Sequence, residues 1–469
     1  MALVFERIQT EGIAELSYLI GDDSAGIAAV IDPRPDVGIY LQLARKHKVS
    51  ITHAFETHIH ADFVSGSREL AAQSGSAKVY ASVEGGAEYG FTIEPVRNGD
   101  HFEFGNTMLT VRHTPGHTPE HVSYEAAQRS KSEPWGVFTG DSLFVSSAGR
   151  PDLLGHDADK LASKLYDTLF GYFAKLDNGV IIYPSHGHGS PCGADIGDRL
   201  ESTIGYEKRF NPYYQQTDRD AFIHHALSTA PPEPTYYKRM KRVNAAGPEV
   251  LGHLPIIPAL SAAQFKRTMS DKGVTLIDTR NMLAFGGGHI DGALNIGATP
   301  MLTIWAGWLL DPENPLLLVL EDDNLADRLA ALFVRSGYTK FAGYLAGGMT
   351  AWDNAAGELT ELPQMTVDEV QTCTDKLQVL DVRAPSEWRG GHVPCATHIF
   401  APDLRKSTGS LEKAKPVVTY CATGYRASIA ASMLQQQGFE DVRTMPGSWT
   451  AWKRAGLPVS KNGDGEHPH

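Results

Sequence analysis

The sequence THIHADF, residues 57–63, decides how the first part of this chain folds. It directly follows an apolar run that predicts a β-strand, so its polar side chains lie at the end of that strand. His58, His60 and Asp62 place two imidazoles and a carboxylate within five positions. Holding such groups close together costs free energy unless a cation binds them. The simplest such cation is a metal ion.

Later stretches supply further candidate ligands. HTPGHTPEH contains His117, FTGDSLF contains Asp141, and YPSHGHGSPCG contains His186. The stretch GRPD, with Arg150 and Asp152, follows FTGDSLF. Taken singly, a histidine in such a stretch is usually an ordinary surface or core residue. All these residues together, each next to a strand-like run, indicate a metal site far more specifically than any one of them.

The order H-x-H-x-D, then H, then D, then H resembles the ligand order of the metallo-β-lactamase superfamily, and the resemblance covers residues 1–245. It implies an αββα sandwich. The stretches ETHIHAD, TPGHT, FTGDSLF followed by GRPD, and YPSHG resemble persulfide dioxygenases more than hydrolases. That resemblance implies one non-haem Fe(II) per chain, with ligands His58, His117 and Asp141, supported by His60, Asp62 and His186. Two histidines and one carboxylate leave open positions for substrate and O₂.

Phe63 departs from the pattern of the dinuclear hydrolases, which have a histidine directly after the aspartate of H-x-H-x-D. A phenyl ring cannot bind a metal, so a second site built on Asp62 and His186 would lack a ligand. This favours one metal ion over two. It does not choose between iron and zinc.

Three more residues near these stretches are candidates for the site. Spacing alone favours a turn salt bridge between Arg150 and Asp152, whereas the family resemblance implies a substrate-binding role near the metal. Cys192 lies six residues after His186 in a loop rich in glycine and proline. It is either a buried, inert thiol or a catalytic residue that holds or relays a persulfide.

The bulk composition excludes several classes of protein. A chain of 469 residues is too long for one core and favours about three domains. It has 42% hydrophobic residues but no apolar run long enough to cross a bilayer, so we expect no membrane partner. The first residues lack a secretory pattern, and we expect a soluble, cytoplasmic protein. A net charge of −13 makes nucleic acid an improbable partner.

The second half of the chain contains an internal repeat. VTLIDTRNMLAFGGGHIDGALNI resembles QVLDVRAPSEWRGGHVPCATHI, and both copies end in a similar TAW sequence. Buried strands alternate with helical stretches, a pattern typical of a parallel sheet flanked by helices. Before the repeat, residues 157–175 predict a helix, and the prolines of residues 228–258 predict an ordered connector without long regular structure.

The last copy, residues 364–460, contains VVTYCATGYRAS, in which Cys421 begins a C-x-x-G-x-R loop between a strand and a helix. Such a loop can wrap backbone N–H groups around an anion, and together with Arg426 it should lower the thiol pKa. Cys421 is the candidate nucleophile, and Gly424 is expected to bind substrate. With LDVR, GGH and PGSWTAW, this copy resembles a rhodanese, which implies sulfur transfer through the cysteine.

The first copy, residues 257–360, keeps LIDTR, GGHIDGALNI and GGMTAW but has no cysteine. In place of the cysteine loop stands LLLVLEDDNLADR, whose three acids would repel sulfur anions. We therefore expect an inactive rhodanese-like domain with a spacer or assembly role, which makes a homo-oligomer plausible. Cys373 and Cys395 have no loop signature and are expected to be structural.

The whole chain resembles persulfide dioxygenase/rhodanese fusions. The resemblance implies oxidation of a low-molecular-weight persulfide by O₂ to sulfite and free thiol, coupled to sulfur transfer that forms or uses thiosulfate. The carrier thiol, whether glutathione, coenzyme A or bacillithiol, and the direction of sulfur flow stay open. The alternatives are a zinc-dependent, glyoxalase II-like thioesterase fused to a sulfurtransferase and a non-enzymatic sulfur-carrier scaffold.

Overall fold

The computed structural model describes residues 3–131, 133–372, 376–409 and 411–461. Cys373, expected to be structural, lies outside these ranges. The chain divides into two compact units, residues 1–254 with 331–338 and residues 255–330 with 339–469. Each unit is described by itself. Among the described residues, no helix combines the length and the apolar character needed to cross a membrane.

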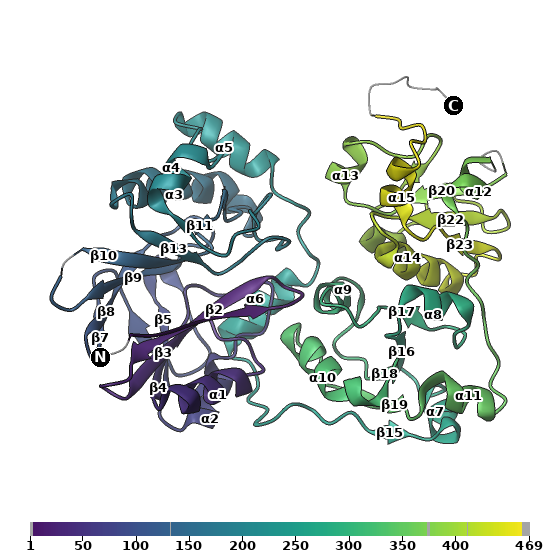
Figure 1. The fold of residues 1–469 in the computed structure, drawn as a ribbon, viewed down its shortest axis with the longest axis horizontal. Coiled ribbons are helices and arrows are strands. Elements are labelled where there is room, and N and C mark those ends of the chain that lie inside the picture. The colour runs from purple at the N-terminus through teal and green to yellow at the C-terminus, as the bar shows by residue number, and fades with distance from the viewer. Residues whose placement is uncertain (1–2, 132, 373–375, 410, 462–469) are drawn as a thin grey trace. The chain divides into compact units, whose positions relative to one another are not determined.

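Two six-stranded sheets form the centre of the first unit (Figure 1). The first sheet has the order β1 (Leu3–Thr10), β2 (Glu15–Asp22), β3 (Ile27–Ile31), β4 (Ser50–Phe55), β5 (Lys78–Ser82) and β6 (Glu94–Val96). The second has the order β14 (Ser202–Thr203), β13 (Ile181–Pro184), β10 (Pro134–Gly140), β9 (Val122–Gln128), β8 (Thr107–His113) and β7 (His101–Phe104). A short ribbon pairs β11 (Leu143–Phe144) with β12 (Ser147–Ala148).

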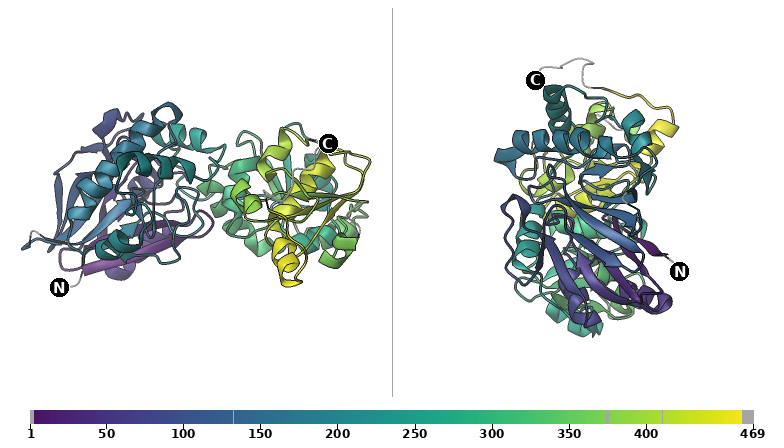
Figure 2. Two further views of the ribbon diagram at one scale, coloured as in Figure 1. Left: turned by 90° about the horizontal axis from the view of Figure 1, so that it is seen from above. Right: turned by 90° about the vertical axis from the view of Figure 1, so that its left-hand side faces the viewer.

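Helices cover the outer faces of both sheets (Figure 2). The first sheet packs against α1 (Gly38–His47) and α2 (Ser67–Ser74), and the second against α3 (Ala158–Gly171), α4 (Ile204–Phe210) and α5 (Arg219–Ser228). The predicted αββα sandwich is therefore confirmed. The helix predicted over residues 157–175 is α3 followed by a 3₁₀ turn, Phe173–Lys175.

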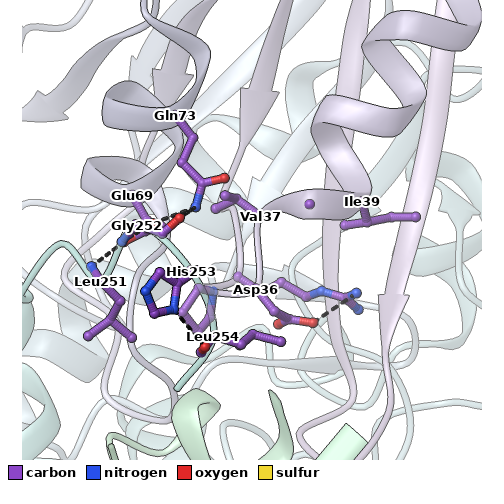
Figure 3. A pocket seen from close by; sticks show the side chains of 12 residues that line it. Asp36, Val37, Ile39, Glu69, Gln73, Leu251, Gly252, His253 and Leu254 are labelled. Atoms are coloured by element: carbon purple, nitrogen blue, oxygen red, sulfur yellow. Dashed lines mark hydrogen bonds and ion pairs between the residues drawn. The ribbon is translucent and has the colours of Figure 1, made fainter. Parts of the chain in front are cut away.

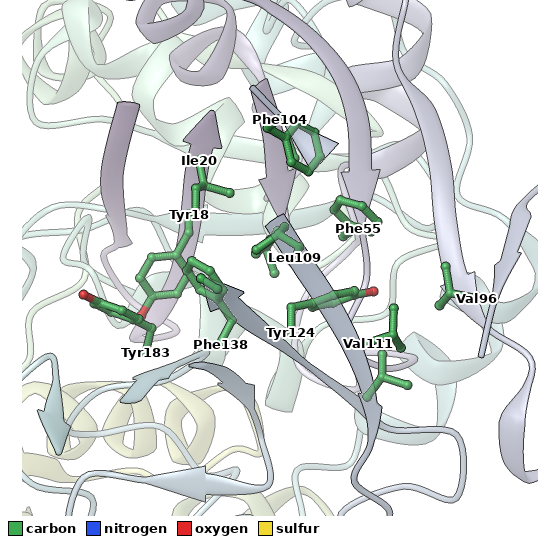
Figure 4. Close-up of a cluster of buried hydrophobic side chains, with 14 of the residues drawn as sticks. Tyr18, Ile20, Phe55, Val96, Phe104, Leu109, Val111, Tyr124, Phe138 and Tyr183 are labelled. Carbon is green, nitrogen blue, oxygen red and sulfur yellow. The ribbon is translucent and has the colours of Figure 1, made fainter. Parts of the chain in front are cut away.

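The core between the sheets follows from alternation along the strands. In β2, Leu16, Tyr18 and Ile20 face the second sheet, whereas Leu19 faces the helical layer. Aromatic rings from both sheets fill this core, as Figure 4 shows for Phe55, Phe104, Tyr124 and Phe138. The loops at one edge of this rigid core contain the candidate ligands.

The connector after α5 is not free of regular structure. Residues Tyr237–Ala246 form the ten-residue helix α6, which buries Tyr237, Met240 and Asn244. The prediction of a connector without long regular structure was wrong here, because the prolines stand before and after this helix rather than inside it.

Two parallel sheets form the second unit, as predicted from the repeat. The first has the order β15 (Ala259–Leu260), β19 (Phe341–Leu345), β18 (Leu316–Val319), β16 (Thr275–Asp278) and β17 (Leu294–Asn295). The second has the order β21 (Thr397–His398), β20 (Gln378–Asp381), β22 (Val417–Tyr420) and β23 (Val442–Thr444).

The described helices that accompany these sheets also occur in two sets. The first set is α7 (Ala262–Thr268), α8 (Met282–Gly287), α9 (Leu302–Leu309), α10 (Ala326–Arg335) and α11 (Gly348–Asn354). The second set is α12 (Val367–Thr372), α13 (Pro385–Arg389), α14 (Tyr425–Gln436) and α15 (Ser448–Arg454).

Candidate functional sites

Three buried side chains that could bind a metal converge in the first unit. His58 follows β4, His117 lies between β8 and β9, and Asp141 follows β10. The Nε2 atoms of His58 and His117 lie 3.9 and 3.4 Å from Oδ2 of Asp141. Within the described part of the chain, none of these nitrogen or oxygen atoms makes a hydrogen bond. Burying these nitrogen and oxygen atoms close together without partners costs free energy. A metal ion bound by all three side chains would offset that cost, so this first triad fits a metal ion.

The other side of each imidazole is fixed by a hydrogen bond. Nδ1 of His117 donates to the carbonyl oxygen of Arg150 over 2.8 Å. Nδ1 of His58 lies 2.9 Å from Oγ1 of Thr57, whose hydroxyl donates to Asp32, so Nδ1 is again the donor. Both rings are thereby held in the tautomer that directs the Nε2 lone pair to the first triad.

Burial controls the charges of the first triad. Desolvation, followed by repulsion from neighbouring imidazoles, lowers the pKa of His58 and His117 well below the usual range. Desolvation raises the pKa of Asp141 to about 6. The histidines are therefore neutral, as metal ligands must be, and a cation would stabilise the Asp141 carboxylate.

A second triad lies beside the first. Asp62, His186 and Cys192 are all buried, and their donor atoms lie within 4.8 Å of one another. Nε2 of His186 lies 3.3 Å from Oδ2 of Asp62 and 3.6 Å from Oδ2 of Asp141. Desolvation, followed by the charges of Asp62 and Asp141, raises the pKa of Cys192 well above its usual value. Cys192 thus lies next to the candidate metal ligands and also packs in a hydrophobic cluster with Phe144 and Tyr237.

The His60 ring packs against the His58 ring, with centroids 4.2 Å apart. Nε2 of His60 lies 3.1 Å from a carboxylate oxygen of Asp32 and 3.1 Å from one of Glu56. Desolvation lowers the pKa of His60, but the attraction and hydrogen bonding of these two carboxylates prevail and raise it. The Phe63 ring packs 4.5 Å from the His60 ring and supplies no donor. His60 is therefore a cation held by two acids, and its supporting role remains a prediction.

Arg150 and Asp152 form a salt bridge. The Arg150 guanidinium donates to both carboxylate oxygens of Asp152, over 2.7 and 2.8 Å, and also to the carbonyl oxygen of Pro191. The backbone N–H of Arg150 donates to the carbonyl oxygen of Cys192. Arg150 thus ties the loop of His117 to the loop of Cys192. The role of both residues in substrate binding stays a prediction.

Helix α6 and Tyr236, the residue before it, supply contacts that the sequence analysis missed. The Asn244 amide donates to the carbonyl oxygens of His60 and Phe63, and the Tyr236 hydroxyl donates to the carbonyl oxygen of Asp62. These bonds hold the backbone of the 57–63 loop from a helix far along the chain. No motif connects the two segments, so sequence inspection offered no signal.

His121 was also missed, although it ends the stretch HTPGHTPEH. Its Nε2 accepts a hydrogen bond from the backbone N–H of Asp141 over 2.9 Å, and its Nδ1 lies near the hydroxyls of Thr114 and Ser142. Burial lowers its pKa to about 3, so it stays a neutral acceptor. His121 positions the backbone of a candidate metal ligand.

A pocket of about 360 Å³ lies elsewhere in the first unit (Figure 3). In it, Glu69 accepts hydrogen bonds from the backbone N–H groups of Leu251 and Gly252, over 2.6 and 2.9 Å. Neither triad contributes to its lining. The pocket is therefore separate from the candidate metal centre.

The candidate nucleophile of the second unit lies between β22 and α14. Cys421 is buried, and its Sγ lies 3.1 Å from the backbone N of Gly424, which donates to it. Gly424 has a φ of 125°, which a residue with a side chain rarely adopts. The loop therefore directs an N–H group to the sulfur, as the C-x-x-G-x-R motif predicts.

Arg426 lies at the start of α14 and pairs with Glu387 of α13. Its guanidinium donates to both carboxylate oxygens, over 2.6 and 2.8 Å. Burial lowers the pKa of Arg426, but hydrogen bonding to Glu387 and the charge of Cys421 prevail and raise it. Glu387 was missed, although it occurs three residues before the glycine pair of the GGH motif. Arg426 is thus a fixed cation beside the loop.

In the first copy, the acids of the loop after β18 accept hydrogen bonds from N–H groups of the protein. The Asp322 carboxylate accepts a hydrogen bond from the N–H of Asn324, and that of Asp323 accepts one from the N–H of Gly347. Glu321 accepts one from the Asn281 amide over 3.2 Å. A 3₁₀ turn, Asp323–Leu325, replaces the anion-binding loop.

Comparisons with known families match both halves of the chain. Residues 11–186 match the metallo-beta-lactamase superfamily, and residues 261–355 and 366–455 each match the rhodanese-like domain. The mitochondrial persulfide dioxygenase ETHE1 of Bos taurus is 30% identical over 197 residues, which are 42% of this chain and 70% of that protein. The cytoplasmic hydroxyacylglutathione hydrolase of Arabidopsis thaliana is 33% identical over 175 residues, which are 36% of this chain and 62% of that protein.

A solved structure covers more of the chain. The crystal structure of a metallo-beta-lactamase from Staphylococcus aureus subsp. aureus COL is 32% identical, covers 73% of this chain and 99% of its own, and superposes with a TM-score of 0.67. Together with the two triads and the cysteine loop, these matches place the chain in a family. It belongs to the persulfide dioxygenases of the metallo-β-lactamase superfamily, fused to two rhodanese-like domains.

Proposed function

We propose that the first unit oxidises a low-molecular-weight persulfide with O₂ at one Fe(II) ion held by His58, His117 and Asp141. The observation that carries this proposal is the convergence of two neutral imidazoles and one carboxylate, whose Nε2 and carboxylate oxygen atoms lack hydrogen-bond partners in the described residues. This donor set suits non-haem iron and leaves positions for two further ligands. Bound there, iron would supply the redox chemistry that O₂ requires.

The overall reaction balances. One persulfide, one O₂ and one water give the free thiol, hydrogen sulfite and one proton. The S–S bond of the persulfide breaks, its terminal sulfur is oxidised, and O₂ is reduced. The chain's own part is to orient the ligands through Thr57 and the Arg150 carbonyl and to bury them away from bulk water.

In the second unit, Cys421 would transfer the sulfane sulfur. Its thiolate attacks the sulfane sulfur of a donor, the donor's S–S bond breaks, and a Cys421 persulfide forms. Attack of sulfite on the outer sulfur then gives thiosulfate and restores the thiolate, and the same steps can run in reverse. The N–H of Gly424 and the nearby guanidinium of Arg426 support this proposal, since both favour a sulfur anion.

We assign the dioxygenase activity to residues 1–245 and the sulfurtransferase activity to residues 364–460. Residues 257–360 would form an inactive rhodanese-like domain. A small-molecule sulfur substrate suits both activities. The carrier thiol, a cytoplasmic location and a homo-oligomer held together by the inactive domain remain predictions.

The test combines iron content with persulfide-dependent O₂ uptake. We expect about one functional iron per chain and O₂ uptake with glutathione persulfide, and His117→Ala should lose both. The exposed His101→Ala is the matched control and should retain both. Zinc as the bound metal, with hydrolysis of S-lactoylglutathione and no O₂ uptake, would favour the thioesterase. Undiminished activity of His58→Ala and His117→Ala would favour a scaffold.

A further inference from the structure

We propose that Glu321 of the first rhodanese-like copy selects the charge of the thiol carrier that exchanges sulfur with Cys421, and that it favours carriers with an ammonium group. The inference rests on the proposed function of Cys421 and deepens it, because it names a class of substrate. It also gives the first copy a part in sulfur transfer, although that copy contains no cysteine.

A pocket of about 500 Å³ in the second unit is lined by both copies. The first copy contributes the loops after β16, β17 and β18, and the second contributes Thr423 and Tyr425. Because these three strands are parallel, their carboxyl ends share one edge of the sheet, where α/β proteins usually bind ligands. Thr423 and Tyr425 flank Gly424, whose N–H donates to Sγ of Cys421. The pocket thus borders the loop that contains the candidate nucleophile.

Direct contacts between the two copies fix the shape of this pocket. The Tyr425 hydroxyl donates to the carbonyl oxygen of Gly297 over 3.0 Å. A Cβ atom on Gly424 would lie 2.5 Å from Sδ of Met282, so Met282 packs directly against the cysteine loop. The walls are therefore preorganised, and a group bound between them is held beside this loop.

Glu321 gives the pocket its charge. Of the described residues that line the pocket, Glu321 alone is charged, and Met282 and Leu325 are among the apolar ones. Its Oε2 accepts hydrogen bonds from the backbone N–H and the side-chain amide of Asn281, over 3.5 and 3.2 Å. The side chain is exposed, so a ligand in the pocket can reach it. Such a carboxylate attracts an ammonium group and repels carboxylate or phosphate groups.

The transfer reaction places the carrier next to this loop in both directions. The Cys421 thiolate attacks the terminal sulfur of a persulfide R–S–SH, and the S–S bond of the persulfide breaks. The terminal sulfur passes to Cys421 with its proton, and the carrier leaves as the thiolate R–S⁻. In reverse, the carrier thiolate attacks the outer sulfur of the Cys421 persulfide. An amino thiol has both features that suit the pocket, a short aliphatic chain and a cationic end.

Acceptor thiols of different charge test the inference on the full-length protein. With thiosulfate as sulfur donor, sulfite release is measured with cysteamine, a cation, 2-mercaptoethanol, which is neutral, and 3-mercaptopropionate, an anion. The intrinsic reactivity of each thiol is the same for every variant, so a change in the ratio of kcat/KM between cysteamine and 3-mercaptopropionate reports on the pocket. Glu321→Gln should lower this ratio by about threefold or more, and Glu321→Lys by about tenfold or more.

The exposed Glu358 of the same copy does not line the pocket, so Glu358→Gln is the matched control and should keep the wild-type ratio. Raising the ionic strength should lower the ratio in the wild-type protein and leave it constant in Glu321→Gln, because salt screens an exposed charge. An unchanged ratio in both Glu321 variants would overturn the inference. Absence of sulfite release with every thiol and with cyanide would instead count against the proposed function, so the two failures are distinguishable.

Discussion

The two rhodanese-like copies share a frame, by which we mean the parallel sheet with its buried Asp-x-Arg ion pair. They differ in the loop that follows β18 in the first copy and β22 in the second. In the first copy the guanidinium of Arg280 pairs with Asp278, and in the second that of Arg383 pairs with Asp381, each with a closest distance of 2.6 Å. Each of these arginines also donates to a glycine carbonyl oxygen, over 2.8 and 2.7 Å. Both ion pairs are buried. The repeated Asp-x-Arg sequence is therefore a structural element that both copies need.

Stacked rings repeat in the same way. His289 stacks on Phe285 with centroids 3.8 Å apart, and His392 stacks on Trp388 with centroids 3.4 Å apart. Nδ1 of each histidine lies near a backbone carbonyl oxygen four residues earlier. The GGH motif thus marks a fold contact in both copies, not a catalytic group.

Around the candidate nucleophile, the copies diverge after the strand that precedes the loop. Asp278 pairs in register with Val319, and Asp381 pairs in register with Tyr420. The residue after Val319 is Leu320, which therefore occupies the position of Cys421. The comparison teaches that the frame determines the fold, and under the proposed function the loop decides which copy transfers sulfur.

The largest expected effect is that of Cys421→Ser on sulfur transfer. We expect a loss of roughly 10³-fold or more, because the hydroxyl replaces the nucleophile in a step that needs a thiolate. Persulfide-dependent O₂ uptake should survive, since the first triad lies in the other unit. Thiocyanate formation from thiosulfate and cyanide measures the transfer. Cys395→Ser is the control, and loss of both activities in a folded Cys421→Ser protein would contradict two separable sites.

The next effect concerns the shared frame. Asp278→Asn and Asp381→Asn should each destabilise the second unit by about 3–5 kcal/mol, because each leaves a buried arginine without its partner. Denaturant unfolding of the full chain measures this loss. The half-exposed pair of Asp441 and Arg443 has a similar geometry, and Asp441→Asn should cost less than about 1 kcal/mol. Unequal losses in the two copies would show that the frames are not equivalent.

A smaller effect is expected at Glu387, which occurs only in the copy with the cysteine loop. Glu387→Gln should reduce sulfur transfer about tenfold, or ~1.4 kcal/mol, because Arg426 loses the carboxylate that orients it. Rates of thiocyanate formation measure this change. Unchanged transfer would show that Arg426 needs no fixed orientation.

The same residue gives a pH prediction. Burial raises the pKa of Glu387, but hydrogen bonds from Arg426 prevail and lower it. Since the folded pKa lies below the unfolded value of about 4.5, the stability from this pair is fully present above that value. It is lost as the pH falls through the folded pKa. Acid unfolding should therefore be less steep in Glu387→Gln than in the wild-type protein.

Sequence patterns predicted the parts of these sites that are local. His58, His117, Asp141 and Cys421 each stand in a short motif at a strand end, where parallel or sandwiched strands bring loops together. The αββα sandwich and the parallel sheets follow from the same alternation of strands and helices. Short motifs and the alternation of strands and helices can be recognised in the sequence without knowledge of tertiary contacts.

The remaining parts depend on contacts between distant segments. Asn244 lies 184 residues from His60, whose carbonyl oxygen it binds, and proline-rich sequence surrounds its helix. The sequence placed Cys192 near His186 but could not show that the thiol joins Asp62.

The smallest expected effect is that of Leu320→Cys, which places a thiol at the position of Cys421. In a Cys421→Ser background we expect no return of sulfur transfer. The loop after Leu320 forms the 3₁₀ turn Asp323–Leu325 instead of the cysteine loop, and the carboxylates of Asp322 and Asp323 accept hydrogen bonds from the N–H groups of Asn324 and Gly347. Three acids would also raise the pKa of a thiol there. Because Leu320 is buried, the smaller side chain should cost about 1–2 kcal/mol of stability. Transfer above a few per cent of the wild-type rate would mean that the frame and a cysteine suffice, and that the loop is not what separates the two copies.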